Sequence, residues 1–307
     1  MISVLIPVYN QKITKLVHSL LDQASKHDIT IEVIALDDKS KPSIKKHNAS
    51  LLHAFNVNYV ELSDNIGRSK IRNWLVKLAR YDHLIFLDCD SELVDDHFLK
   101  SYKEKLPAQV IYGGRIYPAK KPRTARKMLH WKYGTKIESK PAQKRAENPY
   151  ISFMSNNFLV AKELVKKHPF NEEVHGYGYE DLVWARAIEE VSIPIQHIDN
   201  PVIHRGIETN DEFLNKTLNA VKNLDMVHSR GWLPETRLLR SARLILKWKM
   251  MPLFQWWYKR NEKKIEQNLH SDDPNLRYFS LWKMKKLIEI RVKRKAPDRG
   301  PSQLLHY

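Results

Sequence analysis

The first ninety residues alternate between short apolar runs and amphipathic stretches with a helical period. The apolar runs, which read as strands, cover residues 2–8, 30–36, 57–62 and 84–87. The stretches between them, which read as helices, cover residues 11–25, 44–54 and 65–80. Strands that alternate with helices of this length are joined by right-handed crossovers and form a parallel sheet. We therefore predict an α/β fold with a Rossmann-like, mostly parallel sheet flanked by helices.

Two carboxylates follow the fourth apolar run directly. Residues 84–87 read as a strand buried on both faces, and Asp88 and Asp90 come next with one residue between them. Residues i and i+2 of an extended chain point the same way, so both acids emerge at the carboxyl end of the strand, where open α/β sheets bind ligands. Two hard oxygen ligands suit a divalent cation that also holds a diphosphate. For the pair alone, an acidic surface loop is the simpler alternative.

Composition is that of a soluble globular protein, and the length suits one large domain with an extension, or two modest domains. The chain has 307 residues, of which 42% are apolar and 28% charged. The net charge is +17, and residues 236–307 carry 18 Lys and Arg against 6 Asp and Glu. Such a basic tail favours polyanions, either nucleic acid or an anionic membrane surface, although a solvated helical face would also account for it. Cys89 is the only cysteine, so no disulfide forms within the chain.

The ends of the sequence bear on localisation. The chain starts directly with an apolar run, without the basic segment and long apolar core of a signal peptide. It contains no run of about 18 apolar residues, as a membrane-spanning helix would require. We therefore expect a cytoplasmic protein. Residues 238–259 and 282–294 mix aliphatic, basic and aromatic side chains, a pattern typical of helices that lie on a membrane surface. A helical hairpin packed on the rest of the protein, with its aromatics as core, is the alternative.

After Asp90 the periodicity weakens. Residues 118–149 are rich in Lys and Arg with scattered prolines, and they read as a long, partly mobile loop beside the site. A Gly- and aromatic-rich loop covers residues 171–179. Further strands are expected over residues 110–116, 151–160, 193–198 and 202–203. Further helices are expected from residue 161 and over residues 180–191 and 210–228.

Five short motifs occur in a fixed order along the chain. They are Val4-Leu-Ile-Pro-Val-Tyr-Asn10, Leu36-Asp-Asp-Lys-Ser40, Asn65-Ile-Gly-Arg-Ser-Lys-Ile-Arg-Asn73, Leu87-Asp-Cys-Asp90 and Gly178-Tyr-Glu-Asp-Leu182. Together they resemble the non-processive, bacterial-type family 2 glycosyltransferases, which have the GT-A fold. The resemblance covers residues 1–230 roughly, and we expect a GT-A domain over residues 1–232. Residues 233–307 are expected to form a basic, aromatic-rich helical extension that serves as a peripheral membrane anchor.

The resemblance implies that the nucleotide binds at the ends of the first two strands. The residues it assigns there are Pro7, Tyr9, Asn10, Asp37 and Asp38. A carboxylate at a strand end can accept hydrogen bonds from ribose hydroxyls or a base imide, although Asp37 and Asp38 would equally suit a turn or a helix N-cap. Gly67 lets the backbone approach a phosphate at a helix N-terminus. Arg68 and Arg72 follow it on that helix, and Arg68 is the one expected to reach the base or the phosphates.

The resemblance also implies a Mn²⁺ or Mg²⁺ ion that bridges the diphosphate and stabilises the charge of the leaving nucleotide. Asp88 and Asp90 become its ligands, with Asp90 the more direct one. Family members add a histidine well downstream, for which His204 is the candidate and His197 the rival. Arg205, next to His204, could contact a phosphate.

A second pair of acids carries the proton transfer that the resemblance implies. Asp181 becomes the general base that takes the proton of the acceptor hydroxyl, and Glu180 an orienting group or second base. Acids at the start of a helix also complement the helix dipole, which is the simpler reading of the pair. Asn156 and Asn157 lie where relatives contact the donor sugar or the acceptor.

Two departures from the family pattern narrow the function. Processive members carry Gln-x-x-Arg-Trp after the base, and His228-Ser-Arg-Gly-Trp232 is the nearest sequence here. With no membrane spans either, we expect a single sugar addition from a nucleotide-sugar, by default a UDP-sugar, to a saccharide or lipid-linked saccharide in cell-surface polysaccharide or glycolipid assembly. The alternatives are a non-catalytic basic protein that binds membrane or nucleic acid, and a sugar nucleotidyltransferase. The latter would require a Gly-rich loop where residues 7–10 stand, and nucleic acid is not the expected partner.

Overall fold

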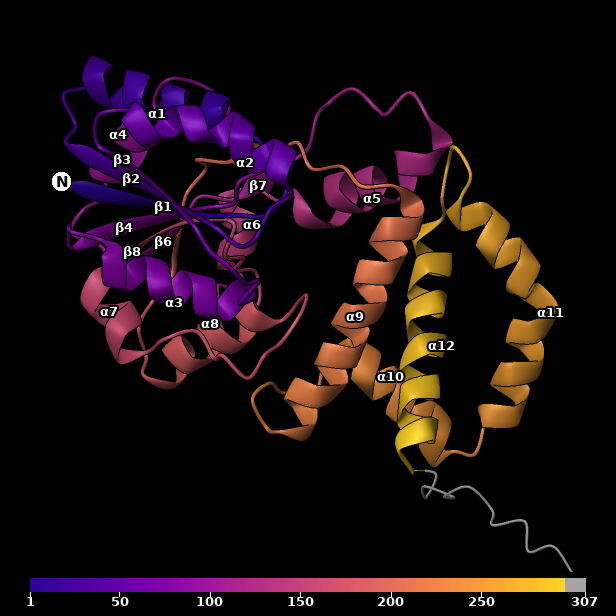
Figure 1. Ribbon diagram of the computed structural model, residues 1–307. Coiled ribbons are helices and arrows are strands. Elements are labelled where there is room, and N and C mark those ends of the chain that lie inside the picture. Colours follow the sequence, from indigo (N-terminus) through magenta and orange to yellow (C-terminus); the bar gives the residue numbers. More distant parts are fainter. Residues whose placement is uncertain (296–307) are drawn as a thin grey trace, which may run out of the picture.

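The first part of the molecule is an α/β unit built on a seven-stranded sheet, which Figure 1 shows at the left of this computed structural model; residues 1–295 are described. The strand order is β3-β2-β1-β4-β8-β6-β9. The first four strands are parallel, and β8 runs antiparallel to both of its neighbours. Their bounds are β1 Ile2–Val8, β2 Ile31–Asp37, β3 Val57–Glu61, β4 His83–Leu87, β8 Asn157–Ala161, β6 Val110–Tyr112 and β9 Gln196–His197. The predicted mostly parallel sheet is confirmed.

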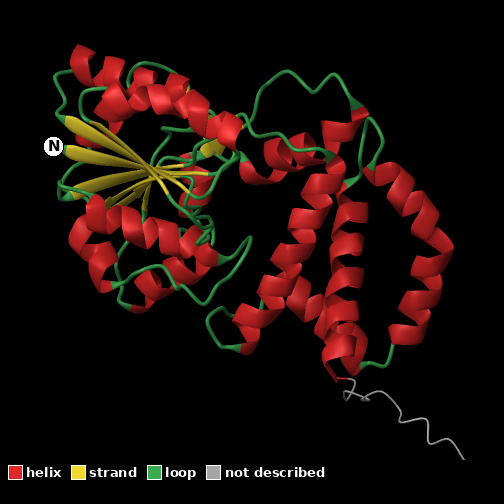
Figure 2. Ribbon diagram, in the orientation of Figure 1, coloured by secondary structure: helices red, strands yellow, loops and turns green. Residues whose placement is uncertain are grey.

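Helices cover both faces of this sheet because alternate residues of the buried strands point to opposite sides (Figures 1 and 2). Val4 and Ile6 of β1 pack with α1, whereas Leu5 packs on the other side with α3. On the first face lie α1 (Thr14–Lys26), α2 (Pro42–Asn48) and α4 (Phe98–Lys103). On the second face lie α3 (Arg68–Leu78), α7 (Lys162–Lys167) and α8 (Glu180–Glu190). A 3₁₀ turn, η1 (Ala49–His53), follows α2.

A small three-stranded sheet brings distant segments to the end of β4. Its order is β5-β10-β7, with β5 over Ser91–Leu93, β10 over Val202–His204 and β7 over Arg115–Ile116. The run predicted as one strand over 110–116 therefore splits between two sheets. The break falls at two glycines, and a Cβ at Gly113 would collide with the Tyr102 hydroxyl and the side chain of Asn157.

The prediction of a long, partly mobile loop over residues 118–149 is wrong about the loop, although the segment does lie beside the site, as expected. The segment contains a 3₁₀ turn, η2 (Ala125–Lys127), helix α5 (Met128–Tyr133), a π-helical turn, η3 (Gly134–Glu138), and helix α6 (Ala142–Ala146). The first three pieces follow one another directly, but the helix type changes at Met128 and again at Gly134, so no single period runs through them. They are fixed by side chains instead, since the buried Arg145 donates to the backbone oxygens of Tyr112, Gly113 and Ile198. The strand predicted over 151–160 likewise forms only from Asn157.

The last helices form a layer beside the sheet (Figure 1). They are α9 (Asn210–Ser229), α10 (Arg237–Lys247), α11 (Met251–Leu269) and α12 (Leu276–Lys295). Val221 and Leu224 of α9 share a core with Leu287 and Ile288 of α12. The buried Asp225 of α9 is also ion-paired with Arg291, at 2.7 Å, and with Arg294. No helix within residues 1–295 has both the length and the apolar character needed to cross a bilayer.

Candidate active site

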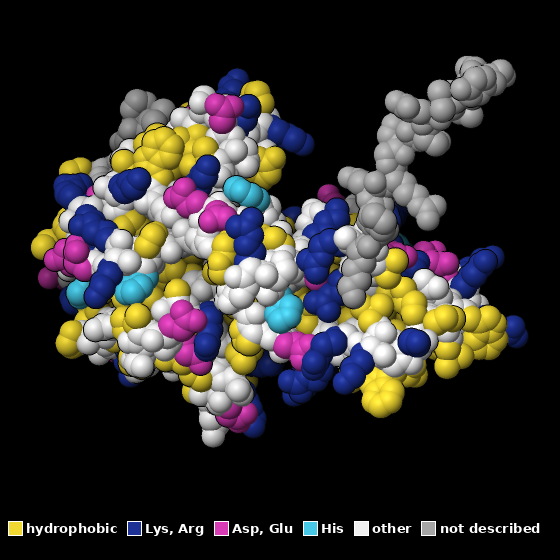
Figure 3. Space-filling view, turned by 90° about the horizontal axis from the view of Figure 1, so that it is seen from below, with side chains coloured by type: hydrophobic (Ala, Val, Ile, Leu, Met, Phe, Trp, Pro, Cys, Tyr) yellow, Lys and Arg dark blue, Asp and Glu magenta, His cyan; other side chains and the backbone are white. Residues whose placement is uncertain are grey.

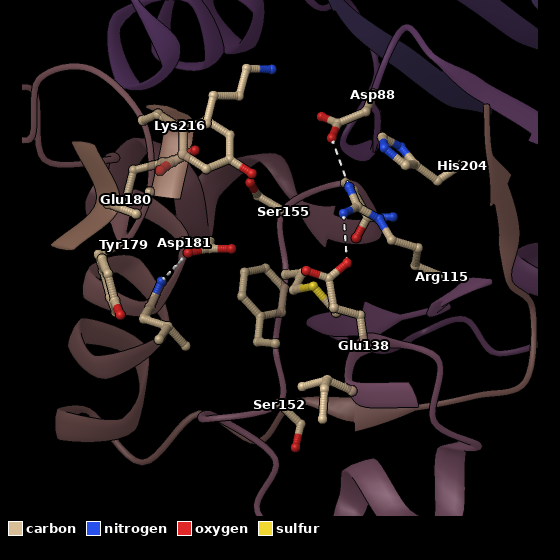
Figure 4. A pocket seen from close by; sticks show the side chains of 18 of the residues that line it. Asp88, Arg115, Glu138, Ser152, Ser155, Tyr179, Glu180, Asp181, His204 and Lys216 are labelled. Atoms are coloured by element: carbon tan, nitrogen blue, oxygen red, sulfur yellow. Dashed lines mark hydrogen bonds and ion pairs between the residues drawn. The ribbon is translucent and has the colours of Figure 1, made fainter. Parts of the chain in front are cut away.

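A cavity of about 410 Å³ opens between the end of β4 and the helical layer. Its walls come from the end of β4, η3, the segment before β8, the start of α8, β10 and α9. Figure 4 shows Asp88, Arg115 and His204 on one side of it, with Asp181, Glu180 and Lys216 on the other. The volume lies in the range of pockets that bind cofactors and small substrates.

Two arginines surround the Asp88 carboxylate. Nη2 of Arg72 lies 3.3 Å from Asp88 Oδ1, and Nη2 of Arg115 lies 3.3 Å from Oδ2. Arg72 is only 2% exposed, and a buried charge needs a partner of opposite charge. Asp88 is one partner, and Glu180 is the other, with its Oε1 3.7 Å from Arg72 Nη1. Arg115 is also bonded to Glu138. Asp88 is thus anchored in a strongly positive environment at the end of β4.

Asp90 is held by His204, a residue more than one hundred positions later in the chain. β10 pairs antiparallel with β5, which sets His204 opposite Ser91 and places its Nδ1 3.2 Å from Asp90 Oδ1. Burial opposes the charge of Asp90, but the hydrogen bond and charge of His204 and the charge of Arg115 lower the pKa of Asp90 to about 2. His197 lies elsewhere, bonded to Arg145 and the Pro149 carbonyl. Of the two histidines considered, His204 accompanies the acids.

The chemistry of this corner fits a divalent cation. Two carboxylates and an imidazole form a donor set that Mn²⁺ accepts. Gly206 lets the Asp90 carboxylate lie directly against the backbone that follows His204, because a Cβ at this position would collide with Asp90 Oδ2. The ligand atoms of Asp88, Asp90 and His204 do not all lie within 4.8 Å of one another in this structure. Among the described residues, the ligand atoms of His27, Asp96 and His97, near the end of α1, meet that condition. There Asp96 is paired with Lys26.

Asp181 and Glu180, adjacent at the start of α8, are in different electrostatic states. Burial, followed by the charge of Glu180, raises the pKa of Asp181 to about 7. Glu180 accepts a hydrogen bond from Arg68 Nη1 at 2.9 Å. Burial alone would raise the pKa of Glu180, but the charges of Arg68 and Arg72 outweigh it, so that the pKa lies below its ordinary value. Asp181 is therefore the acid that can exchange a proton near neutral pH, and Glu180 is held as a paired anion.

The loop that carries Asp181 is fixed by α9. Nδ2 of Asn223 donates to the carbonyls of His175, Tyr177 and Gly178, at 2.7, 3.2 and 3.2 Å. Gly178 has a φ of 94°, and a Cβ there would lie 2.9 Å from Ala220 Cβ, so the loop can touch α9 only with glycine at this position. The guanidinium of Arg68 lies over the ring of Tyr177, with Arg68 Cζ 4.8 Å from the ring centroid.

The residues expected to hold the nucleotide gather at the ends of β1 and β2, outside the cavity walls. Asp37 is fully buried and accepts from the Tyr59 hydroxyl and the Ser40 amide. Asp38 accepts from the amides of Ile66 and Gly67, and burial raises its pKa in spite of these bonds. Both aspartates thus stabilise turns of the backbone. A role in a turn was the alternative to nucleotide binding that the sequence left open for Asp37 and Asp38.

The remaining nucleotide candidates divide between the surface and the site. Asn10 links the same two loops, since its amide donates to Ser40 Oγ and its Oδ1 accepts from Lys41 N. Pro7 is a partly exposed residue of β1 between the buried Ile6 and Val8, and Tyr9 is 54% exposed, which leaves its ring open to a base. Arg68 lines the cavity, in agreement with its preference over Arg72.

The three donor or acceptor candidates have different surroundings. Asn156 lines the cavity, and its buried Nδ2 has no hydrogen-bond partner among the described residues. Asn157 is fully buried and bonded to Gly114 O, Asn200 O and Tyr102 OH, so it holds the β6–β7 break together. Arg205 points to Glu92, with bonds of 2.9 and 2.6 Å, and does not line the cavity.

Several side chains of the site escaped the sequence analysis. Arg115, Glu138, His130 and Asn223 lie in segments without a recognised motif. Glu138 accepts from both Arg115 and the Tyr117 hydroxyl. Burial, followed by the charges of His204 and Arg115, lowers the pKa of His130 to about 3, and its Nδ1 accepts from the Glu208 amide. The two glycines before Arg115 were the one available signal of a tight turn there.

The comparisons define the class of protein. The sequence profile of glycosyl transferase family 2 matches residues 3–168, more than half of the chain, so the chain belongs to this family and is a glycosyltransferase. This result removes the non-catalytic and nucleotidyltransferase alternatives. No curated protein matches the chain.

Solved structures with a similar fold are glycosyltransferases too. One is the mannosyltransferase PcManGT from Pyrobaculum calidifontis in complex with GDP-Man and Mn²⁺, with a TM-score of 0.55, 13% identity and coverage of 95% of this chain and 86% of that one. Another is glucosyl-3-phosphoglycerate synthase from Mycobacterium tuberculosis with Mg²⁺ and UDP, with a TM-score of 0.52, 18% identity and coverage of 77% of this chain and 81% of that one. A third is mannosyl-3-phosphoglycerate synthase from Rubrobacter xylanophilus, with a TM-score of 0.55, 13% identity and coverage of 77% of each chain. At these identities the similarity shows the shared GT-A fold.

Proposed function

We propose that this chain is an inverting, metal-dependent enzyme that moves one sugar from a nucleotide-sugar to an acceptor hydroxyl. The observation that supports it most is the arrangement of carboxylates: Asp88 and Asp181 approach one cavity from opposite walls (Figure 4). One wall can then support a departing diphosphate while the other accepts a proton. The structures of similar fold that were solved with Mn²⁺ or Mg²⁺ and a nucleotide are consistent with this division.

The wall at the end of β4 would hold the diphosphate. Asp88, Asp90 and His204 would bind Mn²⁺ or Mg²⁺, which supplies positive charge to the leaving nucleotide. Arg115 and Arg72 already lie 3.3 Å from Asp88, and Arg68 lines the same cavity. These fixed guanidinium groups add to the positive field at the point where charge develops.

The opposite wall would carry out the proton transfer. Asp181 accepts the proton of the acceptor hydroxyl while the acceptor oxygen bonds to the anomeric carbon of the donor. The bond from that carbon to the diphosphate oxygen breaks in the same step, and its electron pair leaves with the nucleotide. A single displacement of this kind inverts the anomeric configuration. Glu180 keeps Arg68 in place and raises the pKa of Asp181. Nδ2 of Asn156, which has no hydrogen-bond partner within residues 1–295, would donate to a sugar hydroxyl.

The nucleoside would lie outside the cavity, against the ends of β1 and β2. The exposed Tyr9 ring can stack on the base there. Pro7, Asn10, Asp37, Asp38 and Gly67 shape that surface, mainly through the backbone turns that they hold. UDP is the nucleotide we propose, with GDP and dTDP as the competitors in the test below.

The acceptor is proposed to be a saccharide or lipid-linked saccharide used in cell-surface polysaccharide or glycolipid assembly in the cytoplasm. Lys140 and Lys216 line the same cavity as Asp181 and suit an acceptor with anionic groups, for which Lys216 would exchange its pairing with Glu208. We also propose that residues 1–232 form the catalytic domain and residues 233–307 the extension. α9 packs on α12, so the extension would stabilise the wall that carries the base.

The test is a calorimetric screen of UDP-, GDP- and dTDP-sugars against the purified chain, with and without Mn²⁺. We expect one donor class to bind only weakly without the cation, and to be slowly hydrolysed with it. Absence of both binding and hydrolysis for every donor would overturn the proposal. An Arg205→Ala variant serves as the control, because Arg205 points away from the cavity.

A further inference from the structure

The outer face of α10 and α11 carries apolar side chains that the fold does not use. Six of the most exposed large apolar residues lie within fourteen positions of one another, and the most exposed are Trp248 at 68%, Trp256 at 61% and Leu253 at 59%. The others are Leu244, Met250 and Trp257. Single exposed apolar residues are common on soluble proteins, but a contiguous group marks a contact surface. We refer to these six residues as the tryptophan patch.

The cores that hold these helices to the rest of the helical layer do not include the tryptophan patch. Leu239 and Ala242 of α10 are fully buried in the core shared with α9 and α12. Tyr258, Ile265 and Leu269 of α11 are buried in the second core of the helical layer. The aromatics of the tail thus divide into core residues, as the packed-hairpin interpretation expects, and exposed residues, which that interpretation does not explain.

The charge around the tryptophan patch is strongly positive. Residues 237–269 carry nine Lys and Arg against two Asp and Glu. Lys247, Lys249, Lys259 and Arg260 flank the patch, are exposed, and form no ion pair with any described residue. Figure 3 shows hydrophobic and basic side chains gathered together at the end of the molecule away from the sheet.

From this combination we propose that the tryptophan patch docks on a bilayer surface rich in anionic phospholipid. Tryptophan rings prefer the headgroup level, and lysines beside them can reach lipid phosphates. A second copy of the chain is the less suitable occupant. A symmetric contact through the patch would set two basic surfaces against each other. The proposal does not depend on the identity of donor or acceptor.

The test uses the full chain and vesicles of phosphatidylcholine with and without about one-third phosphatidylglycerol. We expect co-sedimentation with the anionic vesicles only, and weaker binding at high salt. A triple variant, Trp248→Ser with Leu253→Ser and Trp256→Ser, should lower the partition coefficient at least tenfold. Trp74→Ser is the matched control, because Trp74 is a 43% exposed tryptophan on α3.

Three results would overturn the proposal. The first is a wild-type chain that does not bind anionic vesicles. The second is a triple variant that binds as well as the wild type while its circular dichroism spectrum is unchanged. The third is a wild-type dimer that the triple variant converts to a monomer without any change in lipid binding, as light scattering would reveal. None of these results bears on donor binding, which is measured separately on the same variants.

Discussion

The two walls of the cavity are built in different ways. On the sheet side, Asp88 and Asp90 directly follow β4, and β10 brings His204 to them through backbone pairing with β5. On the helical side, the loop before Asp181 is fixed by the side chain of Asn223, a residue of α9 that follows more than forty positions later in the chain. The difference implies that the sheet side resists point mutations that keep the strands, whereas the other wall depends on the packing of the helical layer.

The largest effect is expected for Asp181→Asn. This change removes the proton acceptor and preserves the shape, so the transfer rate should fall by about 10²–10⁴ while the donor affinity stays the same. Stopped-flow turnover and calorimetry on one preparation would measure both. Glu180→Gln is the comparison, since Glu180 is paired with Arg68 and Arg72 and its charge raises the pKa of Asp181. That variant keeps the proton acceptor, so we expect it to lower the pH midpoint of the reaction and to cost less rate than Asp181→Asn. Turnover by Asp181→Asn at the wild-type rate would remove Asp181 from its role.

A somewhat smaller effect is expected for Asp90→Asn on the sheet side. The loss of one anionic ligand should weaken Mn²⁺-dependent donor binding by about a hundredfold or more, because even supporting residues of metal sites are worth about 10–100-fold. Calorimetry with and without Mn²⁺ measures the change. If the cation increases donor affinity equally in the variant and the wild type, Asp90 is not a ligand.

The pH dependence of kcat/KM should follow Asp181. Its pKa is raised to about 7, so Asp181 is mostly protonated at lower pH and cannot accept a proton. The rate should therefore fall about tenfold per pH unit below the midpoint and level off above it. A cation on the other wall favours the charged carboxylate and would move the midpoint downward. A rate that rises toward acid pH would contradict the assignment.

A smaller effect is expected for Asn223→Ala on the helical side. Without the three hydrogen bonds to residues 175–178, the loop gains freedom and Asp181 is less well positioned. We expect kcat to fall about tenfold with little change in donor affinity, since small misplacements of catalytic groups are costly. Asn261→Ala is the control, because Asn261 bonds only within α11. Equal activity of the two variants would show that α9 does not position the base.

The sheet side could be predicted from the sequence because its chemistry is local. Asp88 and Asp90 directly follow a buried strand. The spacing of apolar residues predicts this strand and the strands and helices that precede it. The pairing of His204 with Asp90 could be anticipated only as one of two histidines. The register of β10 against β5 decides between them, and no local pattern records that register.

The helical side could not be predicted to the same extent. Residues 118–149 form helical pieces of changing type, so no single period runs through them. Arg145 and Asn223 fix backbone carbonyls of distant segments, and such bonds depend on tertiary contacts. The state of Glu180 is a further example. Its sequence position suggested a second base, whereas Arg68 and Arg72 hold it as a paired anion.

The stereochemistry of the product tests the central claim most directly, namely that opposite walls of one cavity act on the two sides of a single displacement. Proton NMR of the glycoside formed from an α-linked nucleotide-sugar would give the anomeric coupling constant of the product, which as an acetal keeps its configuration in solution. A β-configured product is predicted. A product that retains the α configuration would contradict the account.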